Sequence, residues 1–233
     1  MVTVSKNDFI KLEFTGKIKG TDEVFDTNIK ADAEKAGMDL KDIKPFSLSI
    51  GNKMLPTGFD MDLEGKEMGK NHFLELQPAD AFGKRNPQLV RMIPTKHFHE
   101  QKIDPQRGMQ LNLDGQLVKI LSNSGGRTLV DFNNPLAGKV VTYDYKILGK
   151  IEDEAEKINA LQDFLIRKRF DFDLSSDKKS AVFKVEKQFE QFIEMLAPKF
   201  EEILGIKIKP EVVEAKEKPS KDDSSGPIES KKE

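Results

Sequence analysis

Residues 45–59 decide the fold of this chain, and they read P-F-S-L-S-I-G-N-K-M-L-P-T-G-F. Apolar residues alternate with serines in the first part of this stretch, and a period of two predicts a strand with one buried face. Phe59 and Leu63 then lie four residues apart before Gly65, which predicts a short helix over residues 59–65. The stretch therefore predicts a strand that is followed closely by a small helix.

Three further stretches predict strands that complete a sheet around this helix. They are residues 8–18, which read D-F-I-K-L-E-F-T-G-K-I, residues 73–76 and residues 139–148. In the first of them, apolar and charged residues alternate, as in a half-buried strand. We therefore expect an α+β fold, with an antiparallel sheet wrapped on one short helix and built by residues 1–84 plus 137–152.

Residues 85–136 carry a separate pattern of short strands inside the connection between two strands of that sheet. Asp114-Gly115 is a two-residue hairpin signal, and residues 122–126 predict another turn. Apolar residues alternate on both sides of each turn. A self-contained set of strands within another sheet's connection predicts an inserted, all-β domain.

The pattern changes again after Glu152. Residues 153–213 alternate between helical and strand-like spacing in the order α-β-β-α-β, which predicts a C-terminal α/β module. Pro198 should kink or split the last helix of this module. Residues 214–233 contain only two apolar residues, so we expect a disordered tail.

The C-terminal module is unusually rich in phenylalanine for its size. The residues concerned are Phe170, Phe172, Phe183, Phe189 and Phe192. They are many for so small a core, and dimerisation through this module is therefore a hypothesis.

The composition excludes several classes of function. The 38 basic and 40 acidic residues give a formal net charge of −2, so we expect no binding to nucleic acid. No apolar run approaches the ~18 residues that span a bilayer, and the first residues lack the apolar stretch of a signal peptide. The absence of cysteine excludes thiol catalysis and disulfides. We expect a cytoplasmic protein without a membrane partner.

Conventional catalytic groups are sparse. The three histidines, His72, His97 and His99, do not have the spacing of a metal site, and the chain has no P-loop and no dinucleotide fingerprint. Asp26 and Asp80 could act in acid–base catalysis, but the sequence identifies no partner for either of them. We therefore expect no metal and no cofactor. An enzyme built from these parts would act through the shape and dryness of a pocket.

Seven short motifs, in order, resemble those of FKBP-type peptidyl-prolyl isomerases. They are E-F-T-G at 13–16, V-F-D-T at 24–27, P-F-S-L-S-I-G at 45–51, M-L-P-T-G-F at 54–59, M-G-K at 68–70, D-A-F-G at 80–83 and N-N-P-L-A-G-K at 133–139. The last one is similar to the segment that follows the inserted flap in SlyD-like members. The resemblance covers residues 1–152, and the C-terminal module is similar to that of long archaeal FKBP-type proteins.

This resemblance implies a pocket for proline and names the residues that form it. They are Phe14, Phe25, Asp26, Phe46, Met54, Leu55, Phe59, Phe82, Leu136 and Tyr143. The backbone N–H of Leu55 would bind substrate, Phe59 would form the pocket floor, and Asp26 would orient or polarise the bond that rotates. No cofactor is implied.

Three positions depart from the family pattern. Phe14 and Phe82 stand where the family has tyrosine, so two hydroxyls are missing from the pocket. Thr57 lies between Pro56 and Gly58, where the family commonly has Pro-Gly directly. This extra residue leaves open the register of Phe59 and of the residues before it.

The resemblance also implies that the insert captures unfolded polypeptides. The apolar residues expected to contact such clients are Ile93, Phe98, Leu111, Leu113, Val118, Ile120, Val130 and Phe132. The alternative is that these residues are the insert's own core. The His- and Cys-rich metal-binding tail of some SlyD-like proteins has no counterpart here.

Three functional hypotheses therefore remain. The first is a peptidyl-prolyl isomerase that acts on folding, proline-containing polypeptides and holds them through the insert. The second is a polypeptide-binding chaperone whose proline pocket has degenerated, as the missing hydroxyls of Phe14 and Phe82 suggest. The third is an assembly protein organised by residues 153–213. This third hypothesis is compatible with either of the other two, and it would require a homodimer that forms through the C-terminal module.

Overall fold

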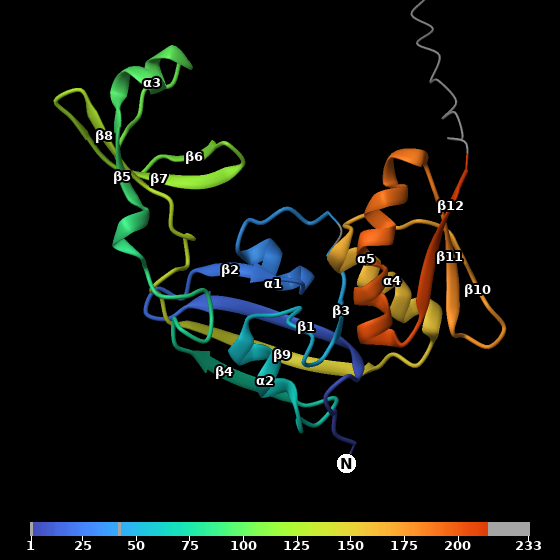
Figure 1. Cartoon of the computed structure of the whole chain (residues 1–233). Coiled ribbons are helices and arrows are strands. Elements are labelled where there is room, and N and C mark those ends of the chain that lie inside the picture. Colours follow the sequence, from blue (N-terminus) through green and yellow to red (C-terminus); the bar gives the residue numbers. More distant parts are fainter. Residues whose placement is uncertain (1, 42, 214–233) are drawn as a thin grey trace, which may run out of the picture. The chain divides into compact units, whose positions relative to one another are not determined.

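A computed structural model describes residues 2–41 and 43–213, and the expected disordered tail at 214–233 lies outside these residues. A five-stranded antiparallel sheet forms the first part of the fold (Figure 1). Its strands are β1 (Phe9–Ile18), β2 (Val24–Thr27), β3 (Phe46–Ser49), β4 (Asn71–Leu76) and β9 (Val141–Lys150). Their order is β2-β1-β9-β4, and β3 also pairs with β1. The predicted α+β sheet is confirmed.

The short helix α2 (Thr57–Leu63) contacts β4 and supplies the centre of the core. The side chains of Phe59 and Leu63 on α2 are fully buried, as their four-residue spacing predicts. Leu12 of β1 pairs with Ile147 of β9, and both are also fully buried. The core therefore lies between the helix and the apolar face of the sheet.

Side-chain hydrogen bonds fasten β2 and the following helix α1 (Lys30–Lys35) to β1. Asn28 accepts a hydrogen bond from the backbone N–H of Phe14 at 2.7 Å and donates one to the carbonyl of Leu12 at 2.8 Å. Thr15 lies 2.8 Å from the hydroxyl of Thr27 and donates to Asp32 of α1 at 2.6 Å. These bonds fix the position of β2 in the sheet.

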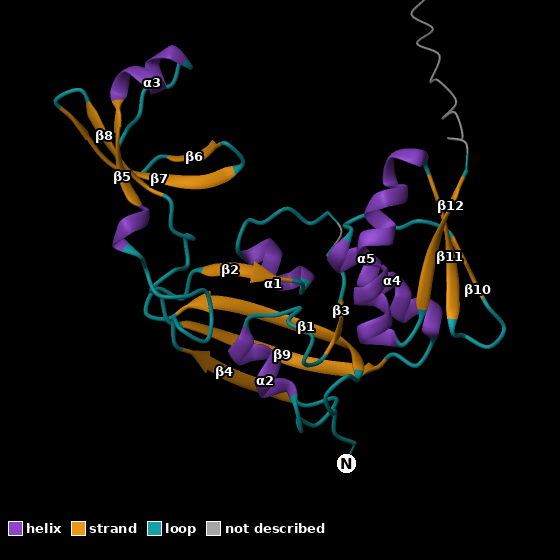
Figure 2. Cartoon of the chain, in the orientation of Figure 1, coloured by secondary structure: helices purple, strands orange, loops and turns teal. Residues whose placement is uncertain are grey.

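The insert folds into its own four-stranded antiparallel sheet, with the order β5-β8-β7-β6 (Figure 2). Its elements are η1 (Pro87–Leu89), β5 (Val90–Pro94), α3 (Thr95–Glu100), β6 (Gln110–Leu113), β7 (Gln116–Ser124) and β8 (Arg127–Asp131). Asp114 and Gly115 both have positive φ, as a tight hairpin turn requires. Strands β6, β7 and β8 agree with the prediction, whereas the alternating pattern gives no signal for strand β5 or for the six-residue helix α3.

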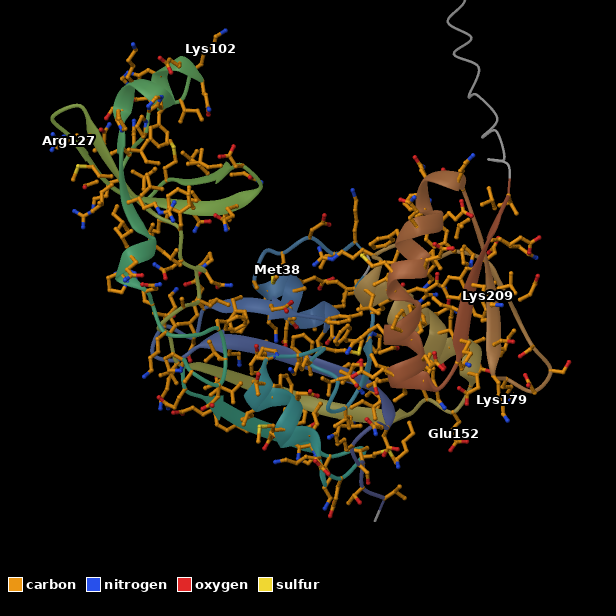
Figure 3. The ribbon with its side chains drawn as sticks, viewed as in Figure 1. Met38, Lys102, Arg127, Glu152, Lys179 and Lys209 are labelled. Atoms are coloured by element: carbon orange, nitrogen blue, oxygen red, sulfur yellow. The ribbon has the colours of Figure 1, made fainter. Side chains whose placement is uncertain are left out.

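Helix α4 (Glu154–Leu165) belongs to the same compact unit as the first sheet. This unit ends at Arg167, whereas the sequence pattern predicts that the C-terminal module begins at residue 153. Glu156 of α4 forms an ion pair with Lys11 of β1 at 2.6 Å, and α4 contacts β3. The chain leaves β9 near Glu152, which is labelled in Figure 3, and enters α4 directly. The boundary of the C-terminal domain stays a prediction.

The second compact unit begins at Lys168. Its elements are β10 (Phe172–Leu174), β11 (Ser180–Val185), η2 (Lys187–Phe189), α5 (Glu190–Leu204) and β12 (Lys207–Val212). β10 is antiparallel to β11, and α5 connects β11 to the parallel strand β12. The expected split of the last helix is wrong, because α5 runs through Pro198 as one helix. Among the described residues, no helix is long and apolar enough to cross a membrane.

Candidate functional site

Five aromatic rings from different elements meet on one side of the first sheet. The ring of Tyr143 on β9 lies 6.0 Å from that of Phe14, 5.7 Å from that of Phe25 and 4.5 Å from that of Phe59, measured between centroids. Phe82 contacts Phe25 edge-to-face at 5.6 Å. The structure thus brings together half of the residues expected to form the proline pocket.

The cluster depends on a glycine in the strand beneath it. Gly16 of β1 pairs with Tyr143 of β9. A Cβ atom at Gly16 would lie 2.6 Å from Cζ of Phe25 and 2.9 Å from Cε1 of Tyr143, which is closer than real Cβ atoms approach. Only glycine therefore lets both rings approach this point of the strand so closely.

Asp26 lies at the edge of this cluster. The residue is exposed, but the apolar groups around its carboxyl exclude enough water to raise its pKa, against the opposing effect of the backbone N–H of Thr27. Burial, followed by the charge of Asp26, raises the pKa of Tyr143. The carboxyl of Asp26 is therefore near enough to affect the Tyr143 hydroxyl electrostatically.

The loop before α2 carries Met54 and Leu55. Asp60 of α2 is buried and accepts hydrogen bonds from the backbone N–H groups of Gly51 at 2.8 Å and Lys53 at 3.0 Å. Met54 is buried, and its sulfur accepts from a backbone N–H within the same turn of chain. Leu55 is half-buried, and in the described part of the chain its backbone N–H has no hydrogen-bond partner. This N–H is free to bind a ligand.

The extra residue Thr57 does not displace the pocket floor. α2 begins at Thr57, and the backbone N–H of Gly58 donates to the carbonyl of Asp80 at 2.8 Å. Phe59 follows and lies 6.1 Å from Phe14, edge-to-face. The register that the sequence leaves open thus places Phe59 within the ring cluster.

Phe46 and Leu136 lie at the margins of the cluster. Phe46 on β3 is half-buried and pairs with Leu12, two residues from Phe14 on β1. Leu136 lines a cleft of about 520 Å³ between the first sheet and the insert, together with Phe25. Neither residue makes a ring contact with the five aromatic residues.

The insert uses several of the expected client-binding residues for its own core. Phe98 of α3 packs on Val118, Ile120 and Val130, and all four are buried. The expectation that these four present an exposed face is corrected, because the helix that the sequence does not predict covers them. Four other expected contacts are only partly buried at the edge of this core: Ile93, Leu111, Leu113 and Phe132.

The exposed apolar residues of the insert lie on the opposite face of its sheet. Met92 is 60 % exposed and Leu117 is 49 % exposed, and each is the sequence neighbour of a core-facing residue. Leu117 and Leu121 line the same cleft as Phe25 and Leu136. A period of two identifies two faces of a strand but does not say which one is covered, so sequence reasoning missed this surface.

Comparisons with known proteins agree with this geometry. A family model described as "FKBP-type peptidyl-prolyl cis-trans isomerase" matches residues 2–104, and a model described as "FKBP26, IF domain" matches residues 91–136. A "probable FKBP-type 16 kDa peptidyl-prolyl cis-trans isomerase" from Pseudomonas fluorescens is 30 % identical over 153 residues, which are 62 % of this chain and 90 % of the relative. The chain belongs to the FKBP-type peptidyl-prolyl cis-trans isomerase family.

Two other relatives lead to the same conclusion. The "short-type peptidyl-prolyl cis-trans isomerase" of Methanocaldococcus jannaschii is 28 % identical over 62 % of this chain and 92 % of its own length. SlyD of Helicobacter pylori is 25 % identical over 64 % of this chain and 76 % of its own length. The chain is therefore an isomerase of peptidyl-prolyl bonds.

The histidines of this FKBP-type isomerase lie outside the ring cluster. His97 and His99 on α3 are exposed and lie 3.5 Å from Glu100 and 3.9 Å from Asp104. In Figure 3, the label Lys102 marks the chain just after this helix. Over residues 2–41 and 43–213, no group of three or more His, Asp or Glu side chains could hold a metal ion.

Proposed function

We propose that this FKBP-type isomerase binds the proline of an X-Pro segment within the cluster of Phe14, Phe25, Phe59, Phe82 and Tyr143. The observation that carries the proposal is the convergence of five rings from separate elements. The loop that leads into α2 adds the backbone N–H of Leu55, which has no hydrogen-bond partner within residues 2–41 and 43–213. The rings offer an apolar site for the pyrrolidine ring of proline. The N–H of Leu55 would hold a substrate carbonyl and fix the direction of the chain.

The proposed mechanism is rotation without a covalent step. An X-Pro bond isomerises in about 10–100 s unassisted, over a barrier of ~18–20 kcal/mol that reflects amide resonance. The twisted transition state loses this resonance, and its carbonyl carries less charge separation than the planar amide. An apolar pocket that fits the twisted form stabilises it more than the planar one, which accelerates rotation.

Two further expected pocket residues have supporting roles in this proposal. Asp26 would orient or polarise the bond that rotates, from its position at the edge of the cluster. Met54, whose side chain is buried, would hold the loop that carries Leu55 rather than contact proline itself. Phe46 and Leu136 would line the margins of the site.

We further propose that the insert holds unfolded polypeptides, as a chaperone does. Support comes from the exposed side chains of Met92 and Leu117 and from the cleft that leads from Leu117 to Phe25. Exposed apolar residues beside a cleft that is lined by both apolar and polar groups are typical of a surface for flexible chains. A client held there would raise the local concentration of its prolines at the pocket.

The experiment is NMR exchange between the cis and trans forms of a Leu-Pro tetrapeptide, alongside refolding of a protein limited by proline isomerisation. Wild type is compared with Asp26→Ala and with Met92→Gln/Leu117→Gln. We expect Asp26→Ala to slow both reactions. The double variant should slow protein refolding alone, because a tetrapeptide is too short to reach the insert.

The same experiment tests the second candidate, a chaperone with a degenerate proline pocket. The absence of hydroxyls on Phe14 and Phe82 favours this alternative. Wild type that leaves tetrapeptide exchange unchanged, yet suppresses aggregation of an unfolded protein, would support it and exclude the proposed pocket.

The C-terminal unit, a homodimer and the cytoplasmic location remain proposals. Phe183 is fully buried and contacts the rings of Phe172 and Phe200, and Phe170 contacts Phe189. Much of the phenylalanine excess thus serves the unit's own core, which weakens the motive for a dimer. Phe192 remains partly exposed on α5, where a second copy would bind. Sedimentation of the full chain as a monomer would exclude a homodimer.

A further inference from the structure

The chain has two tyrosines, and their hydroxyls differ sharply. Tyr143 and Tyr145 both lie on β9, and each is 3 % exposed. The hydroxyl of Tyr145 donates to Asp62 of α2 at 2.6 Å. The hydroxyl of Tyr143 has no hydrogen-bond partner anywhere in the part of the chain that the structure describes. The fully buried side-chain oxygens that lack a partner in these residues do not include that of Tyr143, so its hydroxyl stays accessible to a ligand.

A phenylalanine would supply the same ring without the oxygen. The chain has 16 phenylalanines, and the four other rings of the cluster are all phenylalanine. The ring of Tyr143 already makes the packing contacts with Phe14, Phe25 and Phe59 that a phenylalanine would make. Packing therefore explains the ring at this position but does not explain the oxygen.

The position of the hydroxyl limits what it can bind. It belongs to a ring that is surrounded by the apolar rings of the proline pocket, where it is the one side-chain hydroxyl among the five clustered residues. The nearest influence from a charged group is that of Asp26, which acts electrostatically and not through a hydrogen bond. Because burial and this negative charge both raise the pKa of Tyr143, the phenol keeps its proton and is a hydrogen-bond donor at neutral pH.

We propose that the Tyr143 hydroxyl donates a hydrogen bond to the amide of the X-Pro segment bound in the pocket. This inference rests on the proposed proline pocket and adds a second donor to the backbone N–H of Leu55. It makes Tyr143 the residue that supplies a hydroxyl in a site where Phe14 and Phe82 supply none. Substrate binding would then satisfy the group that is unpaired in the free protein.

The amide offers two acceptors, and kinetics can tell them apart. The carbonyl oxygen accepts a hydrogen bond in both the planar and the twisted amide, so losing a bond to it raises KM. The prolyl nitrogen gains an available lone pair only as the bond twists, so losing a bond to it lowers kcat. Both results support the proposal, and each assigns a different acceptor.

The test compares Tyr143→Phe with Tyr145→Phe in the full-length chain. Both changes remove one oxygen from the same strand, but the hydroxyl of Tyr145 is already bonded to Asp62. We expect Tyr143→Phe to reduce kcat/KM for a Leu-Pro tetrapeptide about tenfold, which corresponds to about 1.4 kcal/mol of transition-state stabilisation. Tyr145→Phe should leave kcat/KM within twofold of wild type.

Thermal unfolding separates this role from a structural one. We expect Tyr143→Phe to match the stability of wild type, since its hydroxyl makes no hydrogen bond within the described residues. Tyr145→Phe should be less stable, because it loses the bond to Asp62. Unchanged kcat/KM in Tyr143→Phe, together with an active wild type, would overturn the proposal and leave the isomerase pocket in place.

A binding measurement tests the contact independently of turnover. With ¹³Cζ-labelled tyrosine, the two residues give two NMR signals, which Tyr143→Phe assigns. Titration with the tetrapeptide should shift the Tyr143 signal and leave that of Tyr145 in place. A wild type without isomerase activity would exclude the proposed function of the pocket. Independently of activity, a Tyr143 signal that does not shift would exclude the proposed hydrogen bond.

Discussion

At the scale of single residues, the site combines an apolar cluster with a few polar groups that lie among apolar neighbours. Asp26 is one of them, because the apolar groups near its carboxyl disfavour the charged form. A carboxyl with a raised pKa in the folded state stabilises the fold only at low pH. This contribution is fully present below the unfolded pKa and is lost as the pH rises through the folded pKa.

The first prediction concerns Asp26→Asn. At neutral pH the variant should be at least as stable as wild type, because it removes a charge that is poorly hydrated in the folded state. The difference should shrink as the pH falls toward 3.8, the ordinary value for aspartate. Chemical denaturation between pH 3 and pH 7 measures this trend. A wild type that is more stable than the variant at neutral pH would contradict it.

The second prediction concerns the close approach of Phe25 and Tyr143 over Gly16. Gly16→Ala would place a methyl group 2.6 Å from Phe25, so one ring must move. We expect a loss of about 1–3 kcal/mol in the free energy of unfolding, as for other overpacked cores, and a lower kcat/KM. Gly149→Ala is the matched control, because a Cβ atom at Gly149 on β9 meets nothing within 4 Å. Equal effects of the two substitutions would show that the rings adapt freely.

At the scale of elements, the predictions that succeeded rest on periodicity with one buried face. The alternation in β1 and the spacing of Phe59 and Leu63 on α2 both describe a single covered side, and the structure covers that side. In the insert, alternation defines two faces, and only the unpredicted helix α3 decides that Val118 is inside and Leu117 outside. Periodicity alone therefore does not show which face of the insert's sheet is covered.

The candidate site shows the same limit. The resemblance named the five aromatic residues. Their contacts depend on the register of the sheet and on the position of α2, which only the structure shows. The resemblance did not identify Asp60, since a buried carboxylate that binds loop N–H groups has the same sequence signal as an exposed one. Such a residue becomes visible only when the loop and the helix are placed together.

The third prediction concerns this contact between an element and a loop. Asp60→Ala would leave the N–H groups of Gly51 and Lys53 without their acceptor. We expect a loss of about 1–3 kcal/mol in stability and a higher KM, because the loop that carries Leu55 is no longer fixed. Asp62→Ala is the control on the same helix, because Asp62 binds the side chains of Tyr145 and Lys66 and not the loop. A KM that rises equally in both variants would refute a specific role for the loop.

At the scale of the whole molecule, the question is where the isomerase unit ends. The sequence pattern changes after Glu152, where an amphipathic helix begins. Amphipathicity shows that one face of this helix is buried, but it does not show which element covers that face. In the structure, Ile158 and Leu161 of α4 are fully buried, and Lys11 and Lys44 of the first unit pair with Glu156 and Asp163. Helix α4 therefore behaves as a part of the isomerase unit.

The fourth prediction compares two shortened chains. A chain that ends at Arg167 should unfold with the stability of the first unit in the full-length protein and keep full activity on a tetrapeptide. A chain that ends at Glu152 should lose about 1.5–3 kcal/mol for each large apolar side chain of α4 that no longer covers the first unit. Urea denaturation followed by tyrosine fluorescence measures both, because Tyr143 and Tyr145 lie in the first unit. If the chain ending at Glu152 is as stable as the longer one, α4 belongs with the C-terminal module, and the predicted boundary at residue 153 is correct.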